Sequence, residues 1–419
     1  MNVAHVLRKY NPAEWGGTET ALQRLCDGLR GQAVRSVVFS PRVAGEFVSD
    51  PLAEAGCVMR RFDAVVPVWG AAPEVKRQMI AVGGNLMSFD LIPSLWREPG
   101  LDVIHVHTMG RIGAIGRMVA RARGLPLVFT AHGGVYDLPD GLRETLNTPD
   151  RAGWEWGKVC GLVMGSRRLL TRADAIITCN LREAELMQLH HPGRRVVVQP
   201  HGVTARSYFI DRRDVARLAF PEVIERTVLL CVGRIDPVKN QAWLIDRLPA
   251  LAERHPDLLL VLAGAVTDEA YAETLKATIR RNGLGGHVLM TGGLPPGDHR
   301  LIGLLQEARA VVLPSVSETF GLVILEAWAA GTAVISSRTS GASALIEPGR
   351  TGLLFDLERP GGFHEAVNAL WSDAGLALRL ASEGQSRVLA DFDTQVLAGR
   401  MRRLYENLIE EKNALRHSA

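Results

Sequence analysis

Apolar residues in the first half of the chain form short runs that alternate with longer stretches of helical periodicity. The short runs predict strands at residues 2–7, 36–40, 57–62, 102–107, 125–131, 175–179 and 195–199. Stretches with apolar residues three or four positions apart predict helices at 18–29, 74–96, 110–123 and 154–171. Strands that alternate with helices in this way are typical of a parallel sheet covered on both faces.

The alternation restarts in the second half, after a charged segment at residues 205–226 that lacks strand periodicity and predicts a linker. Strands are expected at 227–232, 258–263, 287–291, 310–313 and 333–336, each followed by a helix. A last helix, from residue 393 to about 411, has no strand after it. We therefore predict an α/β protein of two doubly wound, Rossmann-like parallel-sheet domains, residues 1–204 and 205–392, followed by a C-terminal helix, residues 393–419.

Composition argues against several classes of protein. The net charge is only +3, and no block of Lys and Arg with interleaved aromatic residues occurs, so a nucleic-acid partner is not expected. The chain has no run of about 18 uncharged apolar residues and opens on a predicted strand, so we expect a cytoplasmic protein without membrane span or signal peptide. Its five cysteines are widely spaced, without a Cys-x-x-Cys pair, which argues against a disulfide framework or a zinc site.

Charge is unevenly distributed along the chain. Residues 1–205 contain 24 Lys and Arg against 19 Asp and Glu, which leaves 24 against 26 in residues 206–419. Two basic segments of the first half, residues 111–123 and 163–172, predict partly amphipathic helices, a pattern that can lie on the anionic surface of a membrane. A helix face exposed to water is the alternative interpretation.

Two glutamates with seven residues between them bracket a glycine at a predicted helix start. Glu318 lies in the loop before the helix, and Glu326 lies one turn into it. Phe320, Gly321 and Leu322 therefore stand where free backbone N–H groups and the positive end of the helix favour a phosphate. Both acids can border one binding site, whereas an exposed loop and an ordinary helix surface are the alternative.

Two cations follow the strand predicted at 227–232. Arg234 and Lys239 come after its carboxyl end, which is the edge at which open parallel sheets bind ligands. A diphosphate would suit both side chains, because Arg offers a planar fork of donors and Lys a mobile point charge. No Asp-x-Asp pair is positioned as a metal ligand, so we expect a site without a metal ion and without a cofactor.

Glycines and histidines follow strands of the first half. Gly16 and Gly17 would let the backbone approach a ligand, since a Cβ atom would obstruct it, although an ordinary tight turn is the alternative. His132 directly follows a predicted strand and should lie at the rim of the sheet. His105 and His107 share one face of their strand, and we expect His105 to pack in the core.

Together these motifs resemble the retaining glycosyltransferases of family 4, which have the GT-B fold, over most of the chain. The resemblance rests on the order and spacing of Trp15-Gly16-Gly17-Thr18-Glu19, Val103-Ile104-His105-Val106-His107, Phe129-Thr130-Ala131-His132-Gly133, Gln199-Pro200-His201-Gly202-Val203, Val232-Gly233-Arg234, Lys239-Asn240, the double-glutamate segment, Ala330-Gly331-Thr332-Ala333 and Gly349-Arg350-Thr351-Gly352. It implies two domains that face a central cleft and a terminal helix that crosses back to the first domain.

The resemblance implies that the C-terminal domain binds a nucleoside-diphosphate sugar, either a UDP-sugar or GDP-mannose. Arg234 and Lys239 would stabilise the leaving diphosphate, Glu326 would bind the ribose and Glu318 the hydroxyls of the donor sugar. Leu294 would lie near the base. The configuration of the transferred hexose would be retained through front-face attack by the acceptor hydroxyl, without a protein nucleophile.

The N-terminal domain would bind the acceptor, which is a glycan, a lipid-linked glycan or a small polar molecule. The resemblance implies that His132 contacts the transferred sugar, and we expect His201 and Asp137 to contact the acceptor. The segment 136–156, rich in Asp, Pro and Trp, interrupts the alternation and is a candidate for acceptor recognition. The chain departs from the family in having His201 instead of Asn, and Ala333 instead of Pro.

Two other functions remain open. A GT-B nucleotide-sugar epimerase would act on the donor alone, and a non-catalytic module would bind sugar nucleotide or glycan without turnover. The complete set of Arg234, Lys239, Glu318 and Glu326 favours the transferase over both. A dinucleotide oxidoreductase is disfavoured because Gly-x-Gly-x-x-Gly does not follow the first strand.

Overall fold

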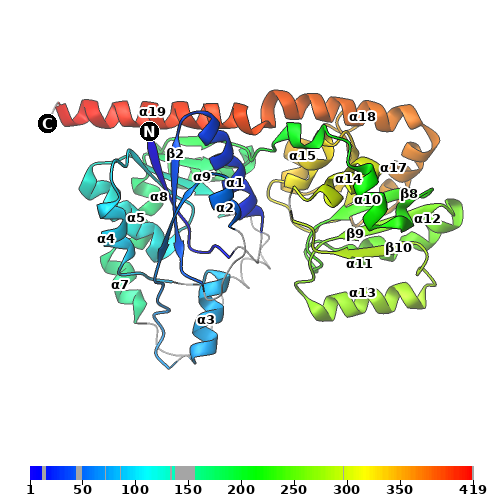
Figure 1. Cartoon of the computed structure of the whole chain (residues 1–419), viewed down its shortest axis with the longest axis horizontal. Coiled ribbons are helices and arrows are strands. Elements are labelled where there is room, and N and C mark those ends of the chain that lie inside the picture. Colours follow the sequence, from blue (N-terminus) through cyan, green and yellow to red (C-terminus); the bar gives the residue numbers. More distant parts are fainter. Residues whose placement is uncertain are drawn as a thin grey trace. The chain divides into compact units, whose positions relative to one another are not determined.

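A computed structural model describes residues 1–11, 16–43, 50–70, 72–84, 86–132, 135–136, 156–295 and 297–417. The chain divides into two compact units, Met1–His201 with Thr394–Ala419, and Gly202–Asp393. Each unit is built on a parallel sheet with helices on both faces (Figure 1). The division lies a few residues from the boundaries predicted at 204 and 392, and the α/β class with two Rossmann-like domains is confirmed.

The N-terminal unit contains a seven-stranded sheet in the order β3-β2-β1-β4-β5-β6-β7. Its strands are β1 Asn2–Val6, β2 Arg35–Pro41, β3 Val58–Phe62, β4 Val103–Val106, β5 Leu127–Ala131, β6 Ala175–Thr178 and β7 Val196–Val198. Its helices are α1 Gly17–Gly31, α2 Pro51–Glu54, α3 Pro73–Val82, α4 Leu91–Arg97, α5 Gly110–Arg123, α7 Gly157–Val163, η1 Ser166–Arg168, α8 Leu169–Arg172, α9 Leu181–His190 and α19 Thr394–His417. Nearly every residue of the central strands is buried, as expected for a sheet covered on both faces.

Two helices predicted in this unit are broken. The prediction of one helix over 74–96 is wrong, because α3 ends at Gly83 in a left-handed conformation, and Met87 pairs with Val65 before α4 begins. Gly165, also left-handed, separates α7 from the short η1 and α8, so the prediction of a continuous basic helix over 163–172 is wrong as well. Each break begins at or next to a glycine in the left-handed conformation, inside a stretch whose apolar periodicity continues.

The second unit contains a six-stranded sheet in the order β10-β9-β8-β11-β12-β13. Its strands are β8 Thr227–Val232, β9 Leu258–Ala263, β10 Val288–Gly292, β11 Ala310–Leu313, β12 Ala333–Ser337 and β13 Leu353–Phe355. Its helices are η2 Ala205–Tyr208, α10 Arg213–Ala219, η3 Pro221–Val223, α11 Gln241–Ile245, α12 Leu248–Arg254, α13 Glu269–Arg281, α14 His299–Glu307, α15 Leu322–Ala329, α16 Ser340–Leu345, α17 Gly361–Ser372, α18 Ala374–Arg387 and the π-helix η4 Val388–Phe392. The sequence did not predict β13, whose three residues are too few for a periodic signal.

The segment 205–226 is not the linker predicted from its charge. It forms η2, α10 and η3, and α10 packs on α14 so closely that a Cβ atom on Gly303 would lie 2.2 Å from the carbonyl oxygen of Arg212. The Gln306 side chain of α14 also donates to the carbonyl oxygens of Tyr208 and Ile210. Because α10 is short and carries charged residues on its exposed side, nothing in the sequence indicated the side that packs on α14.

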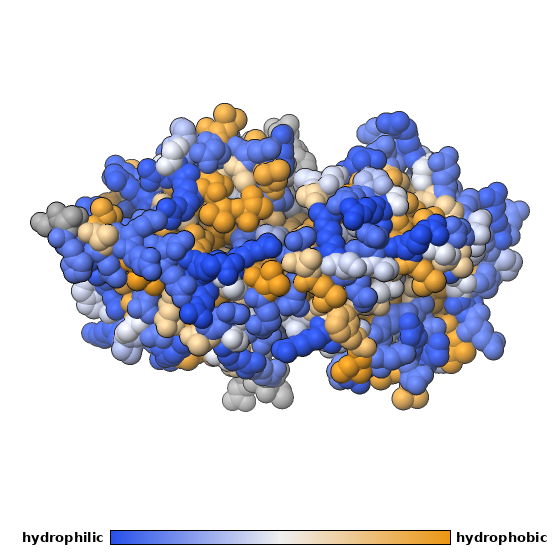
Figure 2. Space-filling view, turned by 90° about the horizontal axis from the view of Figure 1, so that it is seen from above, coloured by the Kyte–Doolittle hydropathy of each residue, from blue (hydrophilic) through white to orange (hydrophobic). Residues whose placement is uncertain are grey.

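The last helix, α19, packs on the N-terminal unit. Met401, Tyr405 and Leu408 are buried against it, and a Cβ atom on Gly28 of α1 would lie 2.6 Å from the carbonyl oxygen of Thr394. Figure 1 shows α19 in red beside α1, and Figure 2 shows that the outward surface along it is mainly hydrophilic. Within the described ranges, no helix is both long and apolar enough to span a membrane.

Candidate functional site

The loops that follow β8 and β11 meet at the carboxyl edge of the second sheet. β8 and β11 are neighbours, and the backbone N–H of Val316 donates to the carbonyl oxygen of Val238 at 2.9 Å. Across this contact Lys239 Nζ lies 2.5 Å from Glu318 Oε2. Both side chains are only about one-fifth exposed, at 22% and 23%. The structure thus joins the two predicted donor loops through an ion pair at the edge where parallel sheets bind ligands.

Arg234 lies beside this pair and is held by a carboxylate that the sequence analysis missed. Its guanidinium is 3.1 Å from Asp236 Oδ2 and is 57% exposed, so most of its donors face solvent. Asp236 also accepts the backbone N–H of Lys239 at 3.0 Å. Buried Asp236 therefore orients both the backbone of Lys239 and the side chain of Arg234. In the sequence, only the Arg-x-Asp spacing could have indicated this contact.

A left-handed glycine opens α15. Gly321 has φ +94°, and a Cβ atom on it would lie 2.8 Å from Ile324 Cδ1, so no other residue fits without strain. Phe320 is buried and packs edge-on against Phe392, while Leu322 is half-buried. The side chain of Phe320 anchors the turn, which leaves the backbone at the start of α15 as the part that can meet an anion.

The remaining predicted donor residues are placed differently. Glu326 lies one turn into α15 and is buried. The backbone carbonyl of Glu318 accepts from the N–H of Gly341 at 2.8 Å, which brings the start of α16 against the loop, a contact that the sequence analysis also missed.

Leu294 follows β10, which β9 separates from β8. A Cβ atom on Gly264 would lie 1.9 Å from the carbonyl oxygen of Gly233, so the loops after β8 and β9 touch through backbone alone.

A chain of histidines occupies the corresponding edge of the first sheet. His132 follows β5, and its Nε2 lies 2.7 Å from His107 Nδ1. The ring of His201 stacks on His132 at a centroid distance of 5.4 Å and an interplanar angle of 16°. Burial lowers the pKa of His132 to about 3 and that of His201 to about 4. A neutral imidazole can donate a hydrogen bond to a ligand or accept one from it, but it brings no charge to the site.

Two further histidines lie deeper in this unit. His5 Nδ1 is 3.0 Å from His107 Nε2, a contact that the sequence analysis missed because one histidine in an apolar strand carries no signal of its partner. His105 is fully buried, as expected, and its ring nitrogens bond to Tyr405 and Thr130. Nitrogens of His5, His105 and His107 lie within 4.8 Å of one another, close enough for a metal ion. Because both nitrogens of His105 already have hydrogen-bond partners, the donor set fits a hydrogen-bonded cluster better than a metal centre.

The glycine loop lies at the same edge of the first sheet. Gly16 is the N-cap of α1, and its carbonyl oxygen accepts from the hydroxyl of Thr20 at 3.0 Å. Gly17 is exposed, and a Cβ atom on Gly16 would lie 2.9 Å from Glu19 Oε2. Asp137 and most of the predicted recognition segment 136–156 lie outside the described residues.

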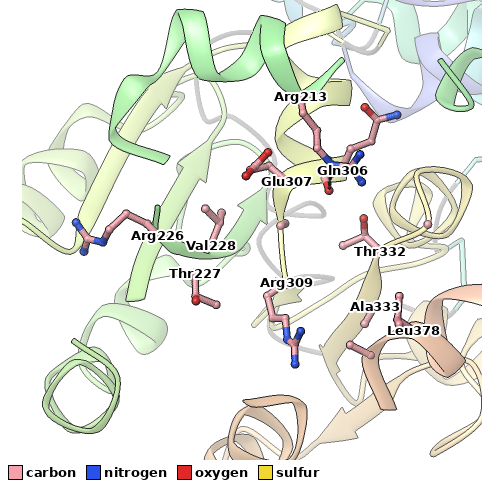
Figure 3. A pocket seen from close by; sticks show the side chains of 13 residues that line it. Arg213, Arg226, Thr227, Val228, Gln306, Glu307, Arg309, Thr332, Ala333 and Leu378 are labelled. Atoms are coloured by element: carbon pink, nitrogen blue, oxygen red, sulfur yellow. Dashed lines mark hydrogen bonds between the residues drawn. The ribbon is translucent and has the colours of Figure 1, made fainter. Parts of the chain in front are cut away.

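A cavity of about 340 Å³ lies at the opposite edge of the second sheet (Figure 3). Thr227, Arg309 and Ala333, which line it, stand at or next to the first residues of β8, β11 and β12. None of the predicted site residues lines it. Because ligands of parallel sheets bind at the carboxyl ends, we assign the candidate site to the edge with Lys239 and Glu318.

Family models and known proteins match most of the chain. The family model described as Glycosyltransferase Family 4 matches residues 15–206, and the model described as Glycosyl transferases group 1 matches residues 215–387. The chain is 30% identical over 335 residues to the D-inositol 3-phosphate glycosyltransferase 2 of Catenulispora acidiphila, covering 76% of this chain and 74% of that protein. It is 29% identical over 320 residues to a glycogen synthase of Mycobacterium tuberculosis, covering 74% and 69%.

Solved structures share the fold. The structure of Anabaena Alr3699/HepE in complex with UDP and glucose matches with a TM-score of 0.72 and 20% identity, covering 96% of this chain and 99% of that one. A sucrose-phosphate synthase from Thermosynechococcus elongatus also matches with a TM-score of 0.72 and 20% identity, covering 98% and 99%. Together with the two parallel-sheet units, these matches show that the chain is a GT-B glycosyltransferase and belongs to glycosyltransferase family 4.

Proposed function

We propose that the protein transfers a hexosyl group from a nucleoside-diphosphate sugar to an acceptor hydroxyl with retention of configuration. The observation that carries the proposal is the joining of Lys239 and Glu318 beside the start of α15, at the carboxyl edge of the second sheet. A UDP-sugar is the first donor to test, because the related Anabaena structure is a complex with UDP and glucose, and GDP-mannose is the second.

The positive groups of the site suit the leaving diphosphate. During transfer the bond between the sugar carbon and the diphosphate oxygen breaks, the bond to the acceptor oxygen forms on the same face, and the acceptor proton passes to the leaving phosphate. Lys239, the exposed guanidinium of Arg234 and the backbone N–H groups around Gly321 would stabilise the negative charge that develops. This charge stabilisation needs no metal ion or cofactor, so we propose that activity persists when divalent cations are chelated.

The acids and the remaining residues would position the donor. Glu318 would accept from hydroxyls of the donor sugar while its other contact holds Lys239 in place. Buried Glu326 would bind the ribose, and backbone near Leu294 would contact the base. Gly16 and Gly17 would let backbone N–H groups reach the donor from the first unit.

The N-terminal unit would bind the acceptor. We propose that His132 contacts the transferred sugar, and that His201 and Asp137 contact the acceptor, with Asp137 assigned from the sequence alone. The names of the relatives suggest two acceptors to try, D-inositol 3-phosphate and an α-glucan, which represent a small polar acceptor and a glycan.

A lipid-linked acceptor would require contact with a membrane surface. The short helix α7 exposes three apolar side chains, Val159, Leu162 and Val163, and the next short helix, η1, carries exposed Arg167 and Arg168. Apolar side chains bordered by arginines suit the interface of an anionic bilayer. The double change Leu162→Ser with Val163→Ser should reduce binding to anionic vesicles, and unchanged binding would remove the proposal of peripheral contact.

A transfer assay tests the function directly. UDP-glucose and GDP-mannose are each incubated with each acceptor, with and without chelator, and the anomeric configuration of the product is read by NMR. We expect an α-linked product from one donor, and a loss of rate of about a hundredfold or more in Glu318→Gln. The matched control is Glu273→Gln, which removes an exposed acid paired with Lys276 on α13. Donor conversion without acceptor would indicate the epimerase, and nucleotide binding without turnover would indicate a non-catalytic module.

A further inference from the structure

Three histidines from neighbouring strands form a continuous hydrogen-bonded chain in the N-terminal unit. His5 Nδ1 is 3.0 Å from His107 Nε2, and His107 Nδ1 is 2.7 Å from His132 Nε2. Both nitrogens of His107 are therefore occupied. The two end atoms, His5 Nε2 and His132 Nδ1, are buried without a hydrogen-bond partner. One end lies inside the sheet in β1, and the other follows the carboxyl end of β5.

Counting protons links the two ends of this chain. A neutral imidazole carries one ring proton, so three rings carry three protons, and two of these occupy the two hydrogen bonds. The third proton must sit on one of the two end atoms. Each hydrogen bond needs one protonated and one bare nitrogen, and each neutral ring has one of each. All three histidines must therefore adopt the same tautomer, either all Nδ1–H or all Nε2–H.

The positions of the two end residues distinguish the two tautomer sets. In the Nε2–H set the unpartnered proton lies on His5, which is fully buried within β1. In the Nδ1–H set it lies on His132, which is half-buried at the edge where parallel sheets bind ligands. Both end nitrogens are buried, so an unpartnered proton costs free energy at either one. Only the proton on His132 can gain an acceptor, because part of the His132 side chain reaches the edge at which a ligand would bind, whereas His5 is fully enclosed. The Nδ1–H set is therefore favoured.

The surroundings keep these three histidines neutral and keep His105 out of their hydrogen bonds. Burial lowers the pKa of His5 and of His132 to about 3 and that of His107 well below its usual value, and the neighbouring histidines add to the effect for His107 and His132. The ring of His105 lies 4.1 Å from that of His107, but its nitrogens bond to Tyr405 and Thr130. His105 therefore packs against His107 without taking part in the hydrogen bonds that link the three histidines.

We propose that His107, supported by His5, is a positioning residue that holds His132 as the Nδ1–H tautomer, so that His132 presents a donor to a hydroxyl oxygen of the bound sugar. The proposal rests on the proposed function, which assigns His132 to the transferred sugar. The tautomer is set by the protein alone, and so it can be measured whether or not a substrate is known.

The test uses the full-length protein labelled with ¹⁵N at histidine. Long-range ¹H–¹⁵N spectra distinguish protonated from bare ring nitrogens, and single substitutions assign the signals. We expect Nδ1–H for His5, His107 and His132 in the wild type. His107→Phe should let His132 populate both tautomers, whereas His107→Gln, whose amide can still donate to His132 Nε2, should retain Nδ1–H. A wild-type His132 protonated at Nε2, or a pure Nδ1–H state in His107→Phe, would overturn the proposal.

Kinetics add a second measurement. His107→Phe should lower kcat for transfer roughly ten- to a hundredfold, the loss typical when a metal-bound histidine loses the partner that orients it, and His107→Gln should recover part of this loss. Tyr405→Phe is the matched control, because it removes a hydrogen bond from the same buried cluster outside the chain of three. Equal losses in Tyr405→Phe and His107→Phe would indicate a structural role only. If no transfer is found with any donor, the proposed function fails, whereas the spectra still decide the tautomer.

Discussion

Single residues of the second unit show how a short sequence motif produces a specific geometry. Lys239 and Glu318 are 79 positions apart, yet the parallel pairing of β8 with β11 brings their loops into contact. The sequence assigned each residue to a donor site because each follows a predicted strand, but it did not predict that the two form an ion pair. It did not predict Asp236 as the partner of Arg234, because an acid in a loop has no periodicity that reveals its neighbour.

Gly321 should be required for the loop at α15. Gly321→Ala places a side chain at φ +94° and a Cβ atom 2.8 Å from Ile324 Cδ1, so we expect a loss of stability of about 1–2 kcal/mol or more. Urea unfolding measures this loss. Gly361→Ala is the control, because the first residue of α17 has open space around the added carbon and should change stability by less than about 0.5 kcal/mol. Equal effects of the two changes would contradict the strain assigned to Gly321.

At the scale of elements, periodicity predicted most helices and strands and failed where one glycine or a few residues decided the outcome. Gly83 and Gly165 end helices inside stretches whose apolar pattern continues. The three-residue β13 is recruited by pairing with β12 and not by its own pattern. Residues 205–226 fold because α10 packs on α14, a tertiary contact that charge composition does not report.

The histidine cluster across β1, β4 and β5 should make stability depend on pH. Burial lowers the pKa of His5 and His132 to about 3 and that of His201 to about 4, below the usual 6.5. At a pH between the lowered pKa of the folded state and the usual 6.5 of the unfolded state, these histidines bind protons only in the unfolded chain. The free energy of unfolding therefore falls as the pH decreases below about 6.5. Each such histidine contributes up to about 1.4 kcal/mol per pH unit.

Urea unfolding between about pH 7 and pH 5 checks this dependence. We expect the unfolding free energy to decrease steadily over this range, and His5→Phe to reduce the slope because one proton acceptor is lost from the unfolded chain. An unfolding free energy that stays constant or increases toward pH 5 would show that the cluster is not held neutral by burial.

At the scale of the whole molecule, the last helix of the chain completes the first unit. Met401 of α19 is buried, whereas Leu415 near its end is 66% exposed. Met401→Ala should therefore destabilise the N-terminal unit by about 2–5 kcal/mol, and Leu415→Ala by less than about 0.5 kcal/mol. Thermal unfolding followed by probes in each unit measures both changes. A shift of the second unit alone in Met401→Ala would contradict the packing of α19.

The order of elements predicted the two-domain α/β architecture, because alternating strands and helices allow few other folds. It could not predict which side chains meet across strands. His5, His107 and His132 lie more than twenty residues from one another, and their contact depends on the register of three paired strands. Such contacts are set by the completed sheet and not by local sequence.

The central claim is that the loops after β8 and β11 bind the diphosphate of the donor. Calorimetric titration of UDP and of GDP into the wild type, Lys239→Ala and Lys276→Ala tests it most directly. Lys276 is an exposed lysine of α13 in the same unit, also paired with a glutamate. We predict that one nucleotide binds the wild type and Lys276→Ala equally and binds Lys239→Ala about ten- to a hundredfold more weakly, as expected for a lost charge-assisted contact. Equal binding by Lys239→Ala, or binding of neither nucleotide to the wild type, would contradict the claim.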